Sequence, residues 1–228
     1  MSAVRVVALV PTYQHAGTLL DVVDGVLSQM DDLIVVDDGS TDDTRELLAG
    51  RSDVIVVHHD SNRGKGAALL SGFARARQEG FTHAISLDAD GQHDPAQLPR
   101  FVEAIRETPG AIIIGARDMR SDNVPRRSRF GLACSNFGIR ALNGLRLPDT
   151  QSGYRAYPLS PLEQLPLAPS RFELEVEVIV RAARSGVPIL SIDIPVHYPP
   201  AGERISHFRP VRDFMRVLWL DCKLLLRW

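Results

Sequence analysis

The 228 residues are 44% hydrophobic and 24% charged, a balance that is typical of a soluble globular protein with one sizeable α/β core. A formal charge of -2 and a pI near 6.4 argue against a general nucleic-acid binder. Two cysteines are too few for a disulfide framework, and no apolar run approaches the ~18 residues of a membrane span. We therefore expect a cytoplasmic α/β protein.

Strand and helix patterns alternate four times in the first half of the chain. The predicted strands are residues 4–10, 33–36, 54–57 and 84–87, and the helices after them cover 18–29, a segment through 48, 67–78 and 95–106. The strands are too apolar to have a face in water. This pattern predicts an α/β fold with a mostly parallel sheet that helices cover on both faces.

The second half is less regular. Residues 118–129 read as a loop, which either covers the site as a lid or is an ordinary solvated loop, and a helix is predicted for 130–142. Residues 147–155 are expected to return to the site. The acids of the stretch 172–177 precede or open a helix that ends near Gly186, and Glu177 is the one we expect to face inward. Residues 187–196 read as a last strand near the sheet edge.

Two carboxylates one residue apart follow the strand 84–87. If Asp88 and Asp90 leave that strand extended, both side chains project to one side, and Gln92 adds an amide oxygen there. Hard oxygen ligands suit Mg²⁺ or Mn²⁺. The alternative is a polar turn between strand and helix. Asp94 before Pro95 is assigned mainly to structure, as a helix N-cap.

Ligands of parallel α/β sheets bind beyond the carboxyl ends of the strands, which places residues 11–15, 37–38 and 88–92 around one crevice. The turn after the first strand lacks the G-x-G-x-x-G pattern of dinucleotide-binding enzymes, and Gly64-Lys65-Gly66 lacks the spacing of a Walker A motif. A receiver-like domain with paired acids would be about half this length.

With these motifs in order, the chain resembles the family 2 glycosyltransferases of the GT-A fold, and within them the polyprenyl-phosphate sugar transferases, of which the dolichol-phosphate mannose synthases are one kind. The matching motifs span about residues 4 to 200. They are Pro11-Thr12-Tyr13, Val36-Asp37-Asp38-Gly39-Ser40, Asn62-Arg63-Gly64-Lys65-Gly66-Ala67, Asp88-Ala89-Asp90-Gly91-Gln92-His93, Gly115-Ala116-Arg117 and Ser152-Gly153-Tyr154-Arg155.

The resemblance implies a metal-dependent, inverting transfer of a sugar from a nucleotide sugar. The metal would be Mg²⁺ or Mn²⁺, with Asp88, Asp90 and Gln92 around it, and Asp90 and Asp149 are the catalytic candidates. The residues expected to bind the nucleotide sugar are Pro11, Tyr13, His15, Val36, Asp37, Asp38, Lys65, Asp88, Ala89, Arg117, Arg204 and His207.

Several of these residues have a second interpretation. Tyr13 either lies against the base or packs in the core. Acids before a helix often cap it, so one of Asp37 and Asp38 is expected to cap and the other to bind. Lys65 either approaches phosphate or is a solvated lysine at a glycine turn. Arg117 has the fork geometry that meets a phosphate.

The chain departs from the family pattern at two places. Where the family commonly has P-T-Y-N-E, this chain has Gln14-His15, so the glutamate contact to the nucleotide is missing. Where the polyprenyl-phosphate enzymes carry R-x-x-G-x-S-K, residues 202–207 place a histidine at the lysine position, with Arg204 nearby. His207 either binds diphosphate when protonated or is a solvated loop histidine.

The acceptor decides the role of Asp149. Transfer to a hydroxyl needs a carboxylate base, whereas a phosphate acceptor is already ionised and leaves Asp149 to orient the substrate or Arg155. A polyprenyl phosphate is the favoured lipid-linked acceptor. The rivals are a hydroxyl of a glycan, glycolipid or small lipid, and a nucleotide-sugar-binding protein that has lost catalysis.

The chain is divided into a GT-A-like domain, residues 1–208, and an amphipathic C-terminal helix, residues 209–228. The helix mixes aromatic and aliphatic residues with five basic and two acidic ones, which is typical of a segment at an anionic membrane surface. The alternative is a helix docked on the domain or on a second copy. We therefore expect a peripheral protein on the inner face of the cytoplasmic membrane, and no nucleic-acid partner.

Overall fold

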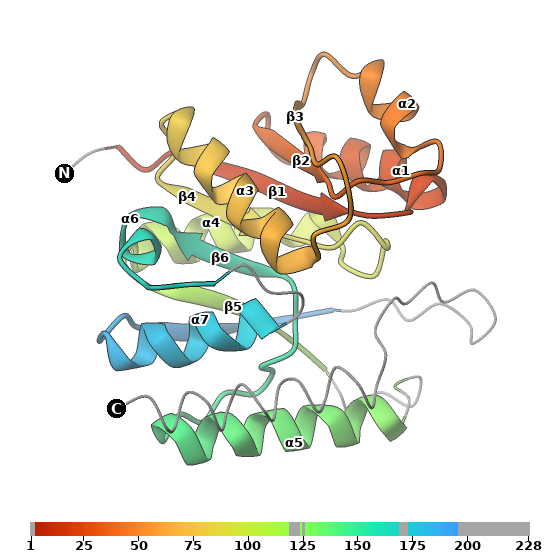
Figure 1. Cartoon of the computed structure of the whole chain (residues 1–228). Coiled ribbons are helices and arrows are strands. Elements are labelled where there is room, and N and C mark those ends of the chain that lie inside the picture. The colour runs from red at the N-terminus through yellow and green to blue at the C-terminus, as the bar shows by residue number, and fades with distance from the viewer. Residues whose placement is uncertain (1–2, 119–123, 125, 169–172, 196–228) are drawn as a thin grey trace.

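The computed structural model describes residues 3–118, 124, 126–168 and 173–195 (Figure 1). Within them, seven strands form one sheet in the order β3-β2-β1-β4-β6-β5-β7. The strands are β1 (Val6–Thr12), β2 (Leu33–Asp37), β3 (Ile55–His58), β4 (His83–Ser86), β5 (Ile112–Arg117), β6 (Arg155–Pro158) and β7 (Ile189–Ile194). The helices are α1 (Ala16–Leu27), α2 (Thr44–Ala49), α3 (Lys65–Gln78), α4 (Leu98–Glu107), α5 (Arg126–Asn143), α6 (Leu159–Glu163) and α7 (Glu173–Arg184), with a short 3-10 turn η1 (Pro95–Gln97).

The sheet is mostly parallel, as the apolar strands predicted. Strand β1 pairs in parallel with β2 and β4, β2 with β3, and β5 with β7. Only β6 runs the other way among the described strands, since it pairs antiparallel with both β4 and β5. This strand was not predicted, because its four residues include a proline and carry no period-2 pattern. It closes the gap between the two parallel parts of the sheet.

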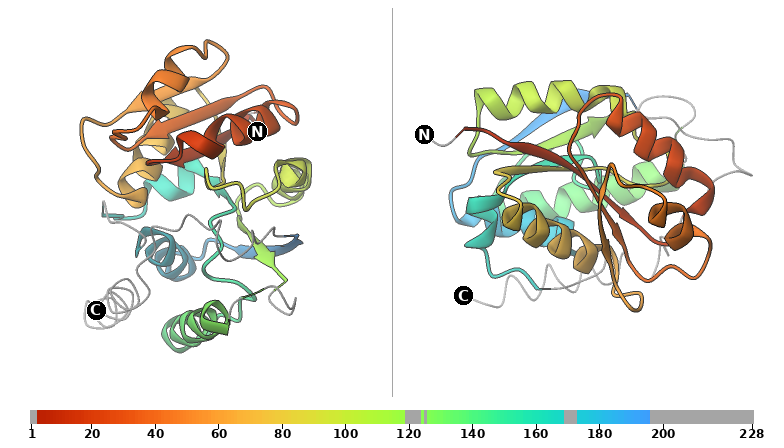
Figure 2. Two further views of the ribbon diagram at one scale, coloured as in Figure 1. Left: turned by 90° about the vertical axis from the view of Figure 1, so that its right-hand side faces the viewer. Right: turned by 90° about the horizontal axis from the view of Figure 1, so that it is seen from above.

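Helices cover both faces of the sheet, which confirms the predicted layers (Figure 2). Val7 and Leu9 of β1 face a core built with α3, α6 and α7, and the alternate residues Ala8 and Val10 face a core built with α1, α2 and α4. Helix α5 packs on α7 at the β7 end of the molecule (Figures 1 and 2). The period-2 geometry of buried strands produces these two separate cores.

Three sequence predictions need correction or fall outside the described residues. Helix α5 begins at Arg126, so the end of the predicted loop 118–129 is its first turn, and residues 119–123 and 125 lie outside the description. Arg204, His207 and the C-terminal helix 209–228 also lie outside it, so the domain boundary stays a prediction. No helix in the described ranges is both long and apolar enough to cross a bilayer.

A fully buried arginine ties together the less regular second half. Arg155, at the start of β6, donates to three backbone carbonyls: those of Ser152 at 2.7 Å, Thr150 at 2.9 Å and Glu175 at 2.7 Å. A buried cation is tolerated only when its donors are satisfied. The guanidinium therefore fixes the loop before β6 against the first turn of α7.

We expect Arg155→Met to lower the free energy of unfolding by about 3 kcal/mol, because three buried carbonyls lose their donor. Urea unfolding followed by circular dichroism measures the change. Arg45→Met, which alters an exposed arginine on α2, is the control and should stay within about 0.5 kcal/mol. Equal effects of the two substitutions would show that the hydrogen bonds of Arg155 do not stabilise this part of the fold.

Candidate active site

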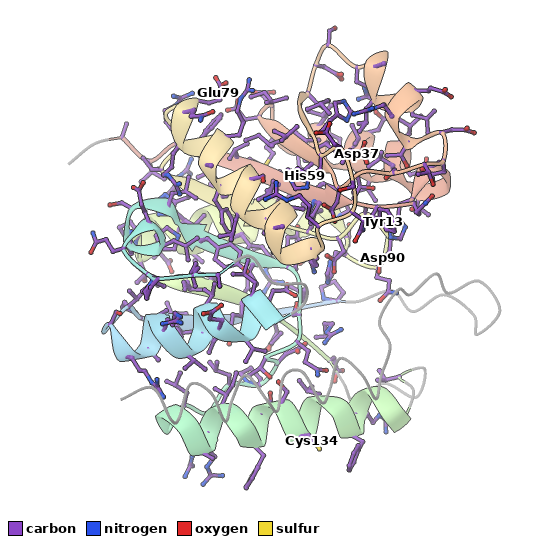
Figure 3. All side chains as sticks on the ribbon, in the orientation of Figure 1. Tyr13, Asp37, His59, Glu79, Asp90 and Cys134 are labelled. Atoms are coloured by element: carbon purple, nitrogen blue, oxygen red, sulfur yellow. The ribbon has the colours of Figure 1, made fainter. Side chains whose placement is uncertain are left out.

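The three polar segments that the sequence predicts around one crevice lie at the carboxyl ends of β1, β2 and β4. Because β1 pairs in parallel with both neighbours, residues 11–15, 37–38 and 88–92 leave the sheet at the same edge. Figure 3 shows Tyr13, Asp37 and Asp90 gathered at this end of the strands. Their roles in binding remain predictions, but the structure brings them together.

The predicted nucleotide residues differ in how they meet this crevice. Pro11 is buried, and Val36 and Ala89 are at most 1% exposed, so the side chains of Val36 and Ala89 belong to the cores. Tyr13 and His15 are half-buried. Val36 and Ala89 therefore present almost no surface to a ligand, whereas Tyr13 and His15 are partly exposed.

Gln14, which stands where the family commonly has asparagine, has a left-handed backbone with a φ of 59°. Such a conformation is strained in a residue other than glycine and persists where neighbours enforce it. Here the backbone N–H of Gln14 donates to the Ser40 hydroxyl at 3.1 Å, and its side-chain amide donates to Thr41 at 2.7 Å. Gln14 thus joins the turn after β1 to the turn after β2.

Asp37 and Asp38 are both buried, and neither caps the following helix. Asp43 occupies the cap position of α2 without a side-chain bond, so the expectation that one of the pair caps this helix is wrong. Asp37 accepts from the Ser40 backbone at 2.9 Å and lies 3.0 Å from His58 Nδ1. Asp37 thus stabilises the turn after β2 and contacts the end of β3.

Asp38 orders the loop that leads into α3. Its carboxylate accepts from the backbone N–H groups of Arg63 at 2.9 Å and Gly64 at 2.7 Å. It also lies 2.6 Å from Nδ1 of His59, whose Nε2 is 2.9 Å from the Ser71 hydroxyl. The contacts of Asp38 therefore set where Lys65, the first residue of α3, enters the site.

Lys65 lies between two carboxylates. Its Nζ is 2.5 Å from Asp88 Oδ1 and 3.2 Å from Glu175 Oε1, and its side chain is only 15% exposed. The alternative of a solvated lysine is therefore wrong. A Cβ added at Gly153 would come within 2.7 Å of Lys65 Nζ and 2.5 Å of Asp88 Oδ2, so a larger residue there would displace one member of this pair.

The cluster sets the protonation of its members. Burial acts to lower the pKa of Lys65, but the carboxylates of Asp88 and Glu175 outweigh it and the pKa is raised. Burial acts to raise the pKa of Asp88, but Lys65 outweighs it and lowers the pKa to about 2. Lys65 and Asp88 are therefore an ion pair at neutral pH.

Asp90 has the opposite electrostatic environment. Burial and the neighbouring Asp88 charge raise its pKa to about 6, and its Oδ1 accepts from the Gln92 backbone at 3.0 Å. The two carboxylates repel each other, and a divalent cation bound to them would supply the positive charge that stabilises both. The donor set of Asp88, Asp90 and the Gln92 amide therefore fits Mg²⁺ or Mn²⁺, ions that are commonly held by one or two carboxylates together with substrate phosphates.

No group of three or more His, Cys, Asp or Glu side chains in the described ranges is arranged to hold a metal by itself. Asp94 has the structural role expected of it, since its side chain accepts from Ala96 N at 2.9 Å before Pro95.

His93 is a site residue that sequence reasoning missed. Its Nδ1 accepts from the Asp88 backbone N–H at 3.3 Å, and its ring packs 5.2 Å from that of Tyr154. Burial lowers the pKa of His93 to about 4, so the ring is neutral at pH 7. His93 holds the backbone of Asp88 in place rather than contributing charge.

Asp149 and Arg117 form a second ion pair at the end of β5. Arg117 donates to Asp149 through Nε at 2.6 Å and Nη2 at 3.1 Å, and its backbone N–H adds a third bond at 3.2 Å. The backbone N–H groups of Gln151 and Ser152 donate to the same carboxylate at 3.0 and 3.1 Å. Asp149 is fully buried, with both oxygens occupied by these five donors.

Glu177 is buried, as expected of an acid that faces inward, but the acid of α7 that contacts Lys65 is Glu175. Glu177 accepts from Arg181 Nε at 2.7 Å, one helical turn further along α7. An acid followed four residues later by arginine is a recognisable pair within a helix, and Glu175 has Ile179 at that position instead. This spacing is the signal that could have identified Glu175.

We expect Glu175→Ala to lower the free energy of unfolding by about 2 kcal/mol, because a buried ammonium loses one of its two carboxylates. Chemical denaturation measures the effect. Glu163→Ala is the matched control: it breaks a 3.5 Å pair with Arg77 in which Glu163 is 62% exposed, and its cost should be below about 0.5 kcal/mol. A Glu175 effect no larger than the control would argue against the three-membered cluster.

Comparison with known proteins agrees with this geometry. The family described as glycosyl transferase family 2 matches residues 7–165. An undecaprenyl-phosphate mannosyltransferase of Micrococcus luteus is 31% identical over 207 residues, which cover 83% of this chain and 82% of that protein. A polyprenol monophosphomannose synthase of Mycolicibacterium smegmatis is 30% identical over 203 residues, which cover 83% of this chain and 76% of that protein.

Among solved structures, glucosyl-3-phosphoglycerate synthase of Mycobacterium tuberculosis in complex with Mn²⁺, UDP-glucose and phosphoglyceric acid superimposes with a TM-score of 0.74. The match covers 98% of this chain and 79% of that one at 22% identity, and it shows a shared fold. The fold and the family predicted from the sequence motifs are thereby confirmed. The chain belongs to glycosyl transferase family 2 and is a glycosyltransferase.

Proposed function

We propose that the protein transfers a sugar from a nucleotide sugar to a polyprenyl phosphate, with inversion at the anomeric carbon and with the help of a divalent cation. The two relatives described above are named for transfer to undecaprenyl phosphate and to a polyprenol phosphate, and they match over most of their own length. Because such acceptors reside in membranes, we further propose that the protein acts at the inner surface of the cytoplasmic membrane.

The observation that carries the choice of acceptor is the saturated carboxylate of Asp149. Transfer to a hydroxyl needs a base that can accept a proton. Burial acts to raise the pKa of Asp149, but the hydrogen bonds from Arg117 outweigh it and lower the pKa. With both oxygens occupied and its pKa depressed, Asp149 is a poor base and a good anchor for Arg117.

A phosphate acceptor fits this arrangement, because it is ionised at neutral pH and needs no base. One of its oxygens attacks the anomeric carbon while the bond from that carbon to the diphosphate breaks, and the leaving nucleoside diphosphate takes the electron pair. Arg117, anchored by Asp149 and half-buried, presents a cation on the acceptor half of the site.

On the donor half, Asp88, Asp90 and Gln92 would hold the cation, which when bound neutralises charge on the leaving diphosphate. Asp38 positions the start of α3 and thereby Lys65, whose ammonium lies against Asp88. The nucleotide would lie along Tyr13 and Asp37 at the ends of β1 and β2. No proton transfer is needed in this reaction.

The test pairs two acceptors with one variant. UDP- and GDP-linked hexoses are supplied with Mn²⁺ and either a water-soluble short-chain prenyl phosphate or the corresponding alcohol. We expect transfer to the phosphate and none to the alcohol. Asp149→Asn should reduce kcat/KM for the phosphate by about tenfold, chiefly through a higher acceptor KM, because it loosens Arg117 without removing a base.

Transfer to the alcohol, with a loss of about 10³-fold or more in kcat for Asp149→Asn, would instead identify a hydroxyl acceptor and a base at Asp149. A protein that binds the nucleotide sugar and turns over no acceptor would be a binding protein. Either result would overturn the proposal.

A further inference from the structure

Helix α5 exposes two large aromatic side chains on one face. Phe130 is 71% exposed and Phe137 is 74% exposed, whereas the other exposed large hydrophobic residues of the described chain, Val4 and Leu190, reach 40% and 42%. Residues seven apart lie two turns apart on the same side of a helix. Ala133 lies between them on that face.

A groove of about 340 Å³ continues this surface. It is lined by Ala133, Asn136 and Phe137 of α5, by Arg140 one turn further on, and by Leu145, Arg146 and Leu147 of the segment after the helix. We call the face of Phe130, Ala133, Phe137 and Arg140, together with this groove, the α5 face. Exposed aromatic residues beside arginines are unusual on a surface that faces only water.

The charge of this region is of one sign. Residues 124–147 contain five arginines and no acidic residue, although the whole chain has a formal charge of -2. Arg140 and Arg146 are exposed beside the groove. A surface that combines aromatic side chains with arginines and lacks acids is complementary to the headgroup region of an anionic bilayer.

Asn136, which lines the groove, and Ser135, on the far side of the helix, connect α5 to the loop around Asp149. Asn136 donates to the Pro148 carbonyl at 3.0 Å and accepts from the Thr150 backbone at 3.2 Å. Ser135 accepts from the Thr150 hydroxyl at 2.8 Å. These residues flank Asp149, the anchor of Arg117, so a single helix joins the α5 face to the site.

We propose that the α5 face is a membrane-docking surface that rests on an anionic bilayer, with Phe130 and Phe137 in the headgroup zone and Arg140 and Arg146 near lipid phosphates. The proposal rests on the proposed function, because a phosphate carried by a membrane lipid would reach Arg117 from this side. Two other occupants fit the charge less well. A second copy would bring Arg140 and Arg146 against the same two arginines, and residues 209–228 carry five basic and two acidic residues.

The test uses the full-length chain and sedimentation with phosphatidylcholine vesicles, with and without phosphatidylglycerol. We expect binding that requires the anionic lipid and weakens with salt. Phe130→Ser with Phe137→Ser should reduce binding by about tenfold or more. Val4→Ser with Leu190→Ser, which removes exposed apolar residues elsewhere, should change it less than about twofold. Both variants should unfold like wild type, since the altered side chains are exposed.

Binding that ignores the anionic lipid, or a phenylalanine variant that binds as wild type does, would overturn the proposal. Loss of binding only on removal of residues 209–228 would assign the contact to that segment. A phenylalanine variant that turns a dimer into a monomer without changing vesicle binding would assign the face to self-association.

Turnover of the water-soluble prenyl phosphate separates this inference from the proposed function. The phenylalanine variant should transfer to it at the wild-type rate, because neither residue belongs to the site. Absence of this turnover in wild type would contradict the proposed function, while the vesicle result would still decide the docking surface.

Discussion

One ammonium group connects three elements of this glycosyltransferase around the end of β4. Lys65 contacts Asp88 and Glu175, and thereby connects the start of α3, the turn after β4 and helix α7. Without it, Asp88 and Asp90 would place two like charges in a partly buried crevice, where repulsion is weakly screened. With it, Asp88 is charged and paired. Burial and the charge of Asp88 still raise the pKa of Asp90 to about 6.

Two arginines stabilise the region around the ends of β5 and β6 in a similar way. Arg155 is fully buried and is satisfied by backbone carbonyls, and Arg117 is held by Asp149. Arg155 is the first residue of the antiparallel strand β6, and Arg117 is the last residue of the neighbouring strand β5. Arg155 fixes the backbone of this region, whereas Arg117 is partly exposed and is held in place before any ligand binds.

Much of this was predictable from local pattern. The apolar strands and the helices between them predicted the layered sheet, and the carboxyl-end rule placed the three polar motifs at one edge. The family followed from the order of short motifs. Local pattern did not reveal contacts between distant residues. Lys65 and Glu175 are separated by 110 positions, and the sequence around each residue gives no indication of their contact.

The errors have physical causes of the same kind. One of Asp37 and Asp38 was expected to cap the following helix, α2. Neither does, and Asp38 instead accepts from the backbone N–H groups of residues 63 and 64, beyond the next strand. Strand β6 is held by pairing with β4 and β5 rather than by its own sequence preference. The assignments of Arg204, His207 and the C-terminal helix remain predictions, since they fall outside the described residues.

The central claim is that Asp88 and Asp90 form a cation site that is completed by the donor diphosphate. The most direct measurement is a crystal structure with Mn²⁺ and UDP, in which anomalous scattering locates the metal. The account predicts a peak in contact with the Asp90 carboxylate that is absent from Asp90→Asn crystals with an unchanged fold. Manganese bound away from residues 88–92, or bound equally well by Asp90→Asn, would contradict it.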